Sequence, residues 1–275
     1  TALLFLLLSR APPFGQDPSR GCLGRLLPGL GLASSLGKLV QLGLGTSNYD
    51  GNTTLCMATA VSGYKRSFGS DGPPGCYEDL ERAGAIVLIG ANVADNHPIL
   101  AYRLFRSLDR SDRAKVIVVD PRVTKTATLA DLFLAIRPGR DAYLLNGLAH
   151  LIIREGWVRE EYVRAHTRGY EELKVHVKRF TPAATARATG IPEDQIREAA
   201  SIIGRSGPVF FAWTMGVNHS TQGTETVNCI NNLSNSALDA WPARRGKHDN
   251  GDAPRLQVLL ILEVQVRRNE YLEAL

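Results

Sequence analysis

The sequence predicts an α/β protein built on a doubly wound, mostly parallel sheet. Two observations lead to this prediction: short apolar runs alternate with segments of helical periodicity, and a polar turn containing small residues follows each run. The composition agrees, because 275 residues with 44% hydrophobic and 21% charged side chains can bury a substantial core.

The chain begins with a segment for which no regular element is expected. Residues 1–36 are rich in Leu, Gly and Pro and show no clean period. The pattern changes at Lys38, where a short helical stretch ends in glycines. Polar turn residues then precede a helix that we expect to begin near Thr53 or Thr54. Cys56 would lie in the first turn of that helix.

From there, strands and helices alternate. Strands are expected at 85–89, 115–119, 132–136 and 208–212. Helices are expected at 97–108, 141–155, 159–165, 170–180, 193–204 and 224–233. A helix between two apolar strands makes a βαβ unit, which pairs its strands in parallel. The regular pattern ends after Leu233, and it offers no partner for the apolar run at 257–266.

Charge and cysteine content narrow the function classes. A formal charge of +5 could favour an anionic ligand, but the basic residues are too scattered to indicate nucleic acid. Cys22, Cys56, Cys76 and Cys229 show no paired spacing, which argues against a disulfide scaffold, a zinc finger or a self-contained iron–sulfur site. The apolar opening is too short to span a membrane. We therefore expect a cytoplasmic protein with neither nucleic acid nor membrane as a partner.

The turns after the strands are the candidate ligand site. In doubly wound sheets, ligands bind at the carboxyl ends of the strands. The turns there are 90–95, 120–124, 138–141 and 214–219. Small residues permit close approach, an Asp can accept hydrogen bonds from ribose or guanine, and Arg122 and Thr124 can contact phosphate. One such turn is more often only a turn, but four together favour a nucleotide-binding edge.

Cys56 has two interpretations. A thiol in the first turn of a helix lies at the positive end of the helix dipole, where a thiolate can act as nucleophile or soft-metal ligand. On composition alone, a small buried apolar side chain is the more common role of a cysteine. Cys76 and Cys229 fit structural roles, and His97 fits a cap or a packed imidazole. His219 is the stronger histidine candidate, because it lies in a strand-end turn.

Several segments together resemble a known enzyme family. They are LCMATAV around Cys56, then LIGANVADNHPIL, VVDPRVTKTA, LFLAIRPGRDAYLLNGLAHLII and FAWTMGVNHSTQGTETVNCINNL. Between Lys38 and Leu233 the chain resembles the molybdopterin oxidoreductases of the dimethyl sulfoxide reductase superfamily. Among these enzymes it is most similar to the catalytic subunits of assimilatory bacterial nitrate reductases.

The resemblance implies roles for individual residues. Cys56 corresponds to the thiolate ligand of molybdenum. The positions that would line a molybdopterin guanine dinucleotide or face the active site are Asn52, Gly90, Asn92, Ala94, Asp95, Asp120, Pro121, Arg122, Gly139, Asp141, Met215, Gly216 and His219. The family pattern has Gln where this chain has His219.

The resemblance also implies a cofactor and a reaction. Molybdenum would be held by two molybdopterin guanine dinucleotides and Cys56, and nitrate would be reduced to nitrite by oxygen-atom transfer. Electrons would arrive from a ferredoxin, a flavoprotein or an NADH-dependent reductase subunit through a 4Fe–4S cluster. The family's cysteine ligands for that cluster have no counterpart in this sequence.

The resemblance divides the chain into three segments. Residues 37–233 would be an incomplete core that holds the Cys56 segment and a dinucleotide-binding α/β domain. Residues 1–36 and 234–275 do not follow the family pattern, and a frameshift would account for the tail. We expect this chain on its own to be inactive.

Two alternative functions stay open. A formate dehydrogenase shares the cofactor and the fold, but its metal-binding Cys or selenocysteine is usually followed by His, whereas Met57 follows Cys56 here. The other alternative is a catalytically inactive nucleotide-binding fragment, which is favoured if the chain as written is all that is made.

Overall fold

The structure is a computed structural model that describes residues 35–48, 53–71, 75–109, 113–236 and 258–260. The chain divides into two compact units, Thr1–Asn52 and Thr53–Leu275. In the first unit, the described residues form a helical turn followed by the π-helix η1 (Leu39–Gly43), in agreement with the predicted short helix that ends in a glycine. Expectations for residues 1–34, and for most of the tail after Ser236, fall outside the described residues and stay predictions.

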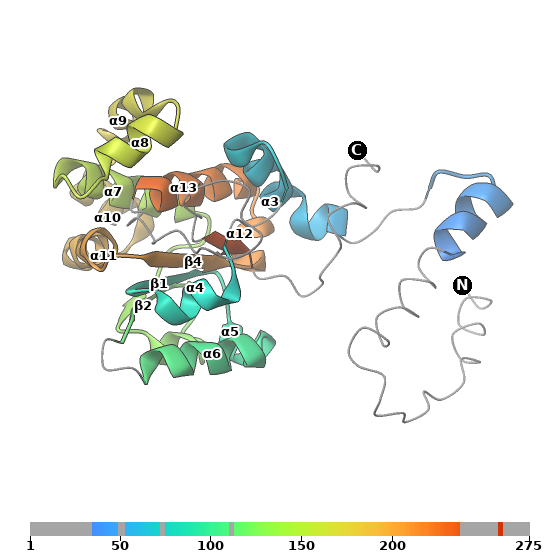
Figure 1. Ribbon diagram of the computed structural model, residues 1–275, viewed down its shortest axis with the longest axis horizontal. Coiled ribbons are helices and arrows are strands. Elements are labelled where there is room, and N and C mark those ends of the chain that lie inside the picture. Colours follow the sequence, from blue (N-terminus) through green and yellow to red (C-terminus); the bar gives the residue numbers. More distant parts are fainter. Residues whose placement is uncertain (1–34, 49–52, 72–74, 110–112, 237–257, 261–275) are drawn as a thin grey trace, which may run out of the picture. The chain divides into compact units, whose positions relative to one another are not determined.

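A parallel sheet forms the centre of the second unit (Figure 1). Its strands are β1 (Ala85–Ile89), β2 (Lys115–Val119), β3 (Leu132–Leu134), β4 (Val209–Trp213) and β5 (Val258–Leu260). Every pairing is parallel, and the spatial order is β3-β2-β1-β4-β5. The direction of winding therefore reverses between β1 and β4, which is the switch point of a doubly wound sheet. The predicted fold class is confirmed.

The strands lie close to their predicted positions. β1 and β2 match, whereas β3 ends two residues earlier than predicted and β4 begins one residue later. β5 lies within the apolar run 257–266, for which the sequence offered no partner, and it pairs with β4.

Helices cover both faces of the sheet (Figure 1). One face packs Leu88 and Phe210 against α4 (Tyr77–Arg82) and α6 (Pro98–Leu108). The other face packs Val87 and Phe211 against α3 (Thr53–Phe68), α7 (Asp141–Arg154), α11 (Glu193–Arg205) and α13 (Gly223–Ser236). Successive strand residues point to opposite faces, so one continuous apolar run supplies both cores.

Several short helices were not predicted. They are α5 (Val93–Asn96), α10 (Pro182–Thr189), α12 (Met215–Asn218) and the 3-10 helix η2 (Ala127–Leu129). The predicted polar turn at 214–219 is therefore wrong in part. The backbone N–H groups of Val217 and Asn218 donate to the carbonyl of Thr214 and close a helical turn there.

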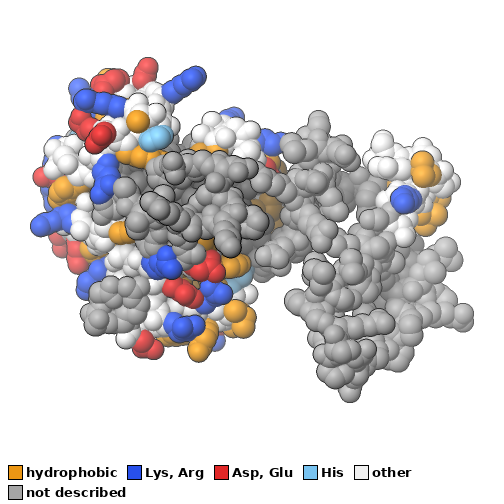
Figure 2. Space-filling view, viewed as in Figure 1, with side chains coloured by type: hydrophobic (Ala, Val, Ile, Leu, Met, Phe, Trp, Pro, Cys, Tyr) orange, Lys and Arg blue, Asp and Glu red, His pale blue; other side chains and the backbone are white. Residues whose placement is uncertain are grey.

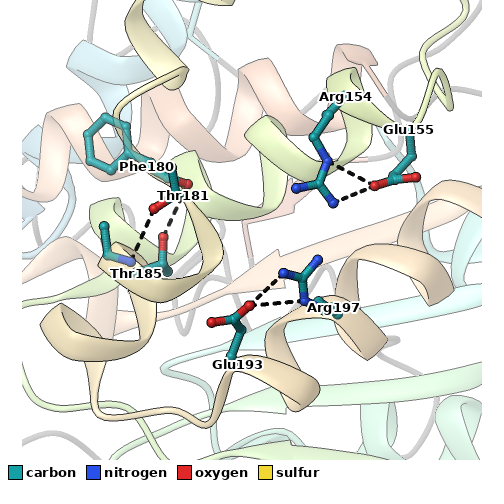
Figure 3. Close-up of polar contacts among 8 residues, drawn as sticks. Arg154, Glu155, Phe180, Thr181, Thr185, Glu193 and Arg197 are labelled. Atoms are coloured by element: carbon teal, nitrogen blue, oxygen red, sulfur yellow. Dashed lines mark hydrogen bonds and ion pairs between the residues drawn. The ribbon is translucent and has the colours of Figure 1, made fainter.

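The predicted helix at 170–180 is too long. α8 (Glu160–His166) and α9 (Tyr170–Val177) occur as expected. The predicted helix ends at Val177, however, and a separate helix, α10, begins at Pro182. Proline has no N–H to continue a helix but suits a first turn, and Thr181 Oγ1 accepts a hydrogen bond from Ala184 N at 3.3 Å. Figure 3 shows this turn, in which the Thr185 hydroxyl donates a hydrogen bond to the carbonyl of Phe180. The same view shows the ion pair between Glu193 and Arg197 of α11.

Charged side chains of both signs cover α8 and α9 (Figure 2). They form ion pairs within each helix, between Arg164 and Glu160 and between Lys174 and Glu171.

Within the part of the chain that the structure describes, no helix is both long and apolar enough to cross a bilayer.

α3 crosses α13 at a glycine. A Cβ on Gly63 would lie 2.7 Å from Val227 Cβ, closer than real Cβ contacts. The Asn228 amide of α13 donates to the carbonyl of Gly63 at 3.0 Å and to Ser67 Oγ at 2.9 Å. This close packing fixes α3, the helix that carries Cys56.

Replacing Gly63 with Ala is expected to destabilise the fold. The added methyl group must push α3 away from α13, and overpacking of this kind costs about 1–3 kcal/mol. Urea unfolding of the chain measures the effect. Ser62→Ala is the control, because Ser62 is exposed on the same helix. Equal stability of the two variants would contradict this packing.

Candidate functional site

The strand-end turns lie along one edge of the sheet. Hydrogen bonds link the ends of neighbouring strands: Gly90 N donates to the carbonyl of Val119 at 2.9 Å, and Asp120 N donates to the carbonyl of Leu134 at 3.3 Å. On the other side of β1, Thr214 Oγ1 donates to the carbonyl of Gly90 at 2.7 Å. The turns after β1, β2 and β4 are thus neighbours, as parallel pairing requires.

β1 and β4 end in a contact between two glycines at the switch point. Gly216 N donates to the carbonyl of Gly90 at 3.2 Å. A Cβ on Gly216 would lie 2.6 Å from Gly90 Cα, and Gly90 itself has a φ of +54°. Only residues without side chains permit this approach. Gly216 is exposed, so its bare backbone faces the space beyond the sheet edge.

Cys56 lies at this switch point. It occupies the first turn of α3, as predicted, and its Sγ donates to Met215 Sδ at 3.0 Å. Both side chains are half-buried and pack against the core. The fold thus brings together Cys56, Gly90, Met215 and Gly216, and the two sulfurs in contact are 159 residues apart in sequence.

A polar cluster follows β1. Asn92 Nδ2 donates to Asp95 Oδ2 at 2.8 Å, and Asn92 Oδ1 accepts from Thr126 Oγ1 at 2.9 Å. The ammonium group of Lys125 lies 2.6 Å from Asp95 Oδ1. Hydrogen bonds from Lys125 and Asn92 lower the pKa of Asp95. Thr126 also accepts from Ala94 N at 3.0 Å, so it ties this turn to the one after β2.

A second polar group follows β2 and β3. Asp120 is buried and accepts a hydrogen bond from Arg122 N at 2.8 Å, while the Arg122 side chain is 77% exposed. Asp141 begins α7, and burial, together with the negative charge of Asp120, raises its pKa. The two carboxylates are therefore close enough to repel each other. Pro121 and Gly139 are exposed beside them.

The candidate residues form two groups along the edge. The group at the switch point contains Cys56, Gly90, Met215 and Gly216, with His219 exposed just after α12. The group over β1 to β3 contains Asn92, Ala94, Asp95, Asp120, Pro121, Arg122, Gly139 and Asp141. Asn52 lies outside the described residues.

Thr126, Thr214 and Asn218 are buried at this edge, and the sequence analysis gave none of them a role, although Thr214 and Asn218 lie within the candidate turn 214–219. Each is a polar residue within or beside a strand-end turn, and burial of such residues is visible only once the fold is known. Across the described ranges, no three His, Cys, Asp or Glu side chains are grouped in a way that could hold a metal ion.

The other described cysteines are unlike a reactive thiol. Burial and hydrogen bonds to Glu78 and Asp79 raise the pKa of Cys76 to about 11. Burial raises the pKa of Cys229 to about 11 as well. Both stay protonated at neutral pH, which agrees with the structural roles expected for them.

A cavity of about 840 Å³ lies elsewhere, between α8, α9 and the ends of α3 and α13. It is lined by residues that include Arg66, Tyr162, His176 and Asn228. No candidate residue lines it, so cavity size does not locate the chemistry here. The sheet edge remains the candidate site because it unites a thiol, carboxylates and bare backbone.

Comparison with known proteins identifies the family. The family model for molybdopterin oxidoreductases matches residues 27–240. The chain therefore belongs to the molybdopterin oxidoreductase family. Within it, the chain is 44% identical over 196 residues to the nitrate reductase of Synechocystis sp., covering 71% of this chain and 28% of that protein.

A formate dehydrogenase subunit and a solved acetylene hydratase are also similar to this chain. The chain is 35% identical over 199 residues to the F420-dependent formate dehydrogenase subunit alpha of Methanocaldococcus jannaschii, covering 72% of this chain and 29% of that subunit. The solved acetylene hydratase from Pelobacter acetylenicus superposes with a TM-score of 0.63 at 27% identity, over 70% of this chain and 26% of its own. The chain thus spans little more than a quarter of the length of the proteins it matches.

Replacing Asp141 with Asn is expected to stabilise the fold at neutral pH. Because the folded state raises the pKa of Asp141 above its ordinary value of 3.8, the folded chain holds this proton more tightly than the unfolded chain. The Asp141 contribution to stability is therefore lost as pH rises through the folded pKa. The amide of the Asp141→Asn variant carries no charge, so the stability of the variant does not fall in this way as the pH rises.

Urea unfolding from acid to neutral pH measures this effect. Asp95→Asn is the control, and its effect on stability should have the opposite sign. The folded state lowers the pKa of Asp95, so the Asp95 contribution to stability is present only at higher pH. A gain in stability for Asp141→Asn that is as large in acid as at neutral pH would contradict the assignment.

Proposed function

We propose that this chain is the dinucleotide-binding core of a molybdenum-dependent nitrate reductase in which Cys56 binds the metal. The position of Cys56 carries the proposal: α3 holds its sulfur at the switch point of the sheet, 3.0 Å from Met215 Sδ. The similarity to the Synechocystis nitrate reductase supports the choice of nitrate as the substrate.

The residues at the sheet edge fit the family's cofactor. Membership of the family implies molybdenum with a molybdopterin cofactor. Cys56 offers a sulfur ligand, which suits a soft-ligand metal site. Gly216 leaves the backbone accessible, and a side chain there would meet Gly90. When bound, the cofactor supplies the two electrons with which an oxygen atom is removed from nitrate to give nitrite.

The chain's own residues bind and orient the cofactor in this proposal. Asp120 and Asp141 would accept hydrogen bonds from guanine N–H groups, and the exposed Arg122 guanidinium would contact phosphate. Asp95, already paired with Lys125, holds the turn after β1 in shape. His219 stands exposed next to the switch point, where its imidazole can hydrogen-bond an oxyanion.

Other properties belong to the proposed whole enzyme. They are a bis-molybdopterin guanine dinucleotide form, a 4Fe–4S cluster with ligands outside this chain, and a ferredoxin, flavoprotein or NADH-dependent donor in the cytoplasm. Each rests on the resemblance of the sequence motifs to assimilatory enzymes.

Formate oxidation is the second candidate, because a formate dehydrogenase subunit is 35% identical to the chain. The identity of Met57 favours nitrate reduction, because formate dehydrogenases usually have His at this position. Its side chain is buried, and its Sδ accepts from Asn218 Nδ2 at 3.4 Å. Assays of the full-length enzyme with nitrate and with formate separate the two, and formate oxidation without nitrate reduction would overturn our choice.

Cys56→Ala is expected to abolish nitrate reduction by the full-length enzyme. Loss of a metal ligand should exceed the roughly 10–100-fold loss typical of an outer-shell change. Metal analysis and nitrite formation measure it. The control is Cys229→Ala, which removes a half-buried thiol from α13 and should keep activity. Equal losses in both variants would show that Cys56 has no special role.

Arg122→Ala is expected to weaken cofactor retention. A hydrogen bond to a charged group contributes about 1.5–3 kcal/mol, so its loss should lower affinity roughly tenfold or more. Molybdenum content of the full-length enzyme after gel filtration measures retention. Arg154→Ala is the matched control: Arg154, at the end of α7, is also an exposed arginine with an acidic partner, Glu155, whereas Arg122 has Asp120 of the sheet edge as its partner. Unchanged retention in Arg122→Ala would remove Arg122 from the phosphate site.

A further inference from the structure

We propose that Asn218 is a positioning residue that sets the place of the Cys56 sulfur through its contacts with α3. The proposal rests on the proposed function only in that Cys56 is taken as the metal ligand. Asn218 is the last residue of α12 and is 1% exposed. It lies within the candidate turn 214–219, but the sequence analysis gave it no role of its own.

Asn218 uses both ends of its side-chain amide. Its Oδ1 accepts from Trp213 Nε1 at 3.1 Å, which ties it to the end of β4. Its Nδ2 donates to Met57 Sδ at 3.4 Å, which ties it to α3. The amide is thus a direct link between the strand end and the helix.

The backbone of Asn218 adds a second link to α3. Its carbonyl accepts from Thr59 Oγ1 at 2.8 Å. Met57 follows Cys56 directly, and Thr59 lies three residues after Cys56, on nearly the same side of the helix as the thiol. Contacts at these two positions restrain both the rotation and the translation of α3 next to the thiol.

α12 therefore meets the first turns of α3 with two side chains. Met215 contacts the Cys56 sulfur, and Asn218, three residues later, contacts Met57. Loss of the Asn218 amide leaves Trp213 Nε1 buried without its acceptor and frees the start of α3 to shift. The Cys56 thiol should then lose its fixed contact with Met215.

Asn231 provides a matched control. It is also buried, at 0% exposure, and its Nδ2 donates to Ser67 Oγ at 2.9 Å. Ser67 lies near the far end of α3, about three turns from Cys56. Asn231→Ala therefore loosens the same helix at a place distant from the thiol.

The test is alkylation of Cys56 by iodoacetamide in the full chain, followed by peptide mass mapping at neutral and alkaline pH. Asn218→Ala is expected to increase the Cys56 rate about fivefold or more, the effect of losing one to two buried hydrogen bonds. Asn231→Ala should leave the rate unchanged. Cys229 in α13, labelled in the same samples, reports general loosening and should not change in either variant.

Thr59→Val is the second variant, used in case Asn218→Ala does not fold. It removes the hydroxyl that donates to the Asn218 carbonyl and adds no larger group, so it should increase the Cys56 rate by a smaller factor. An unchanged Cys56 rate in a folded Asn218→Ala, or an equal increase in Asn231→Ala, would overturn the proposal. Thiol labelling requires no molybdenum, so this result is independent of whether Cys56 binds the metal.

Discussion

The backbone contact between Gly90 and Gly216 is the constraint on which the candidate site depends. It joins the carboxyl ends of β1 and β4 at the point where the winding of the sheet reverses. α12 begins directly after β4, so the same contact sets where Met215 lies. Met215 in turn meets Cys56 of α3. A side chain at either glycine would separate the strand ends and move the thiol's neighbour with them.

The edge combines two kinds of chemistry on one surface. Sulfur and bare backbone lie at the switch point, whereas carboxylates, a guanidinium and an ammonium group lie over β1 to β3. An elongated ligand with a soft-metal end and a charged nucleotide end matches this division. The parallel topology produces it, because each crossover returns the chain to the same edge.

Much of the fold could be predicted from the sequence, because buried parallel strands are continuous apolar runs and need no tertiary information. Cys56 could be placed in a first helical turn from the polar residues before it. α12 could not be predicted, since MGVN has no helical period and is closed by a bond to Thr214. Asn218 was missed for a related reason: its partners Trp213 and Met57 meet only in the folded chain. α10 was hidden by small residues without an apolar stripe.

The separation of Cys56 from Met215 by 159 residues affects how the protein is made. During synthesis the thiol leaves the ribosome long before β4 and α12 do, so its contact with Met215 cannot form until nearly the whole domain has emerged. A cofactor delivered earlier would meet a cysteine on an unpacked helix. On the proposed assignment of Cys56 as a metal ligand, metal loading would therefore have to follow translation of the domain.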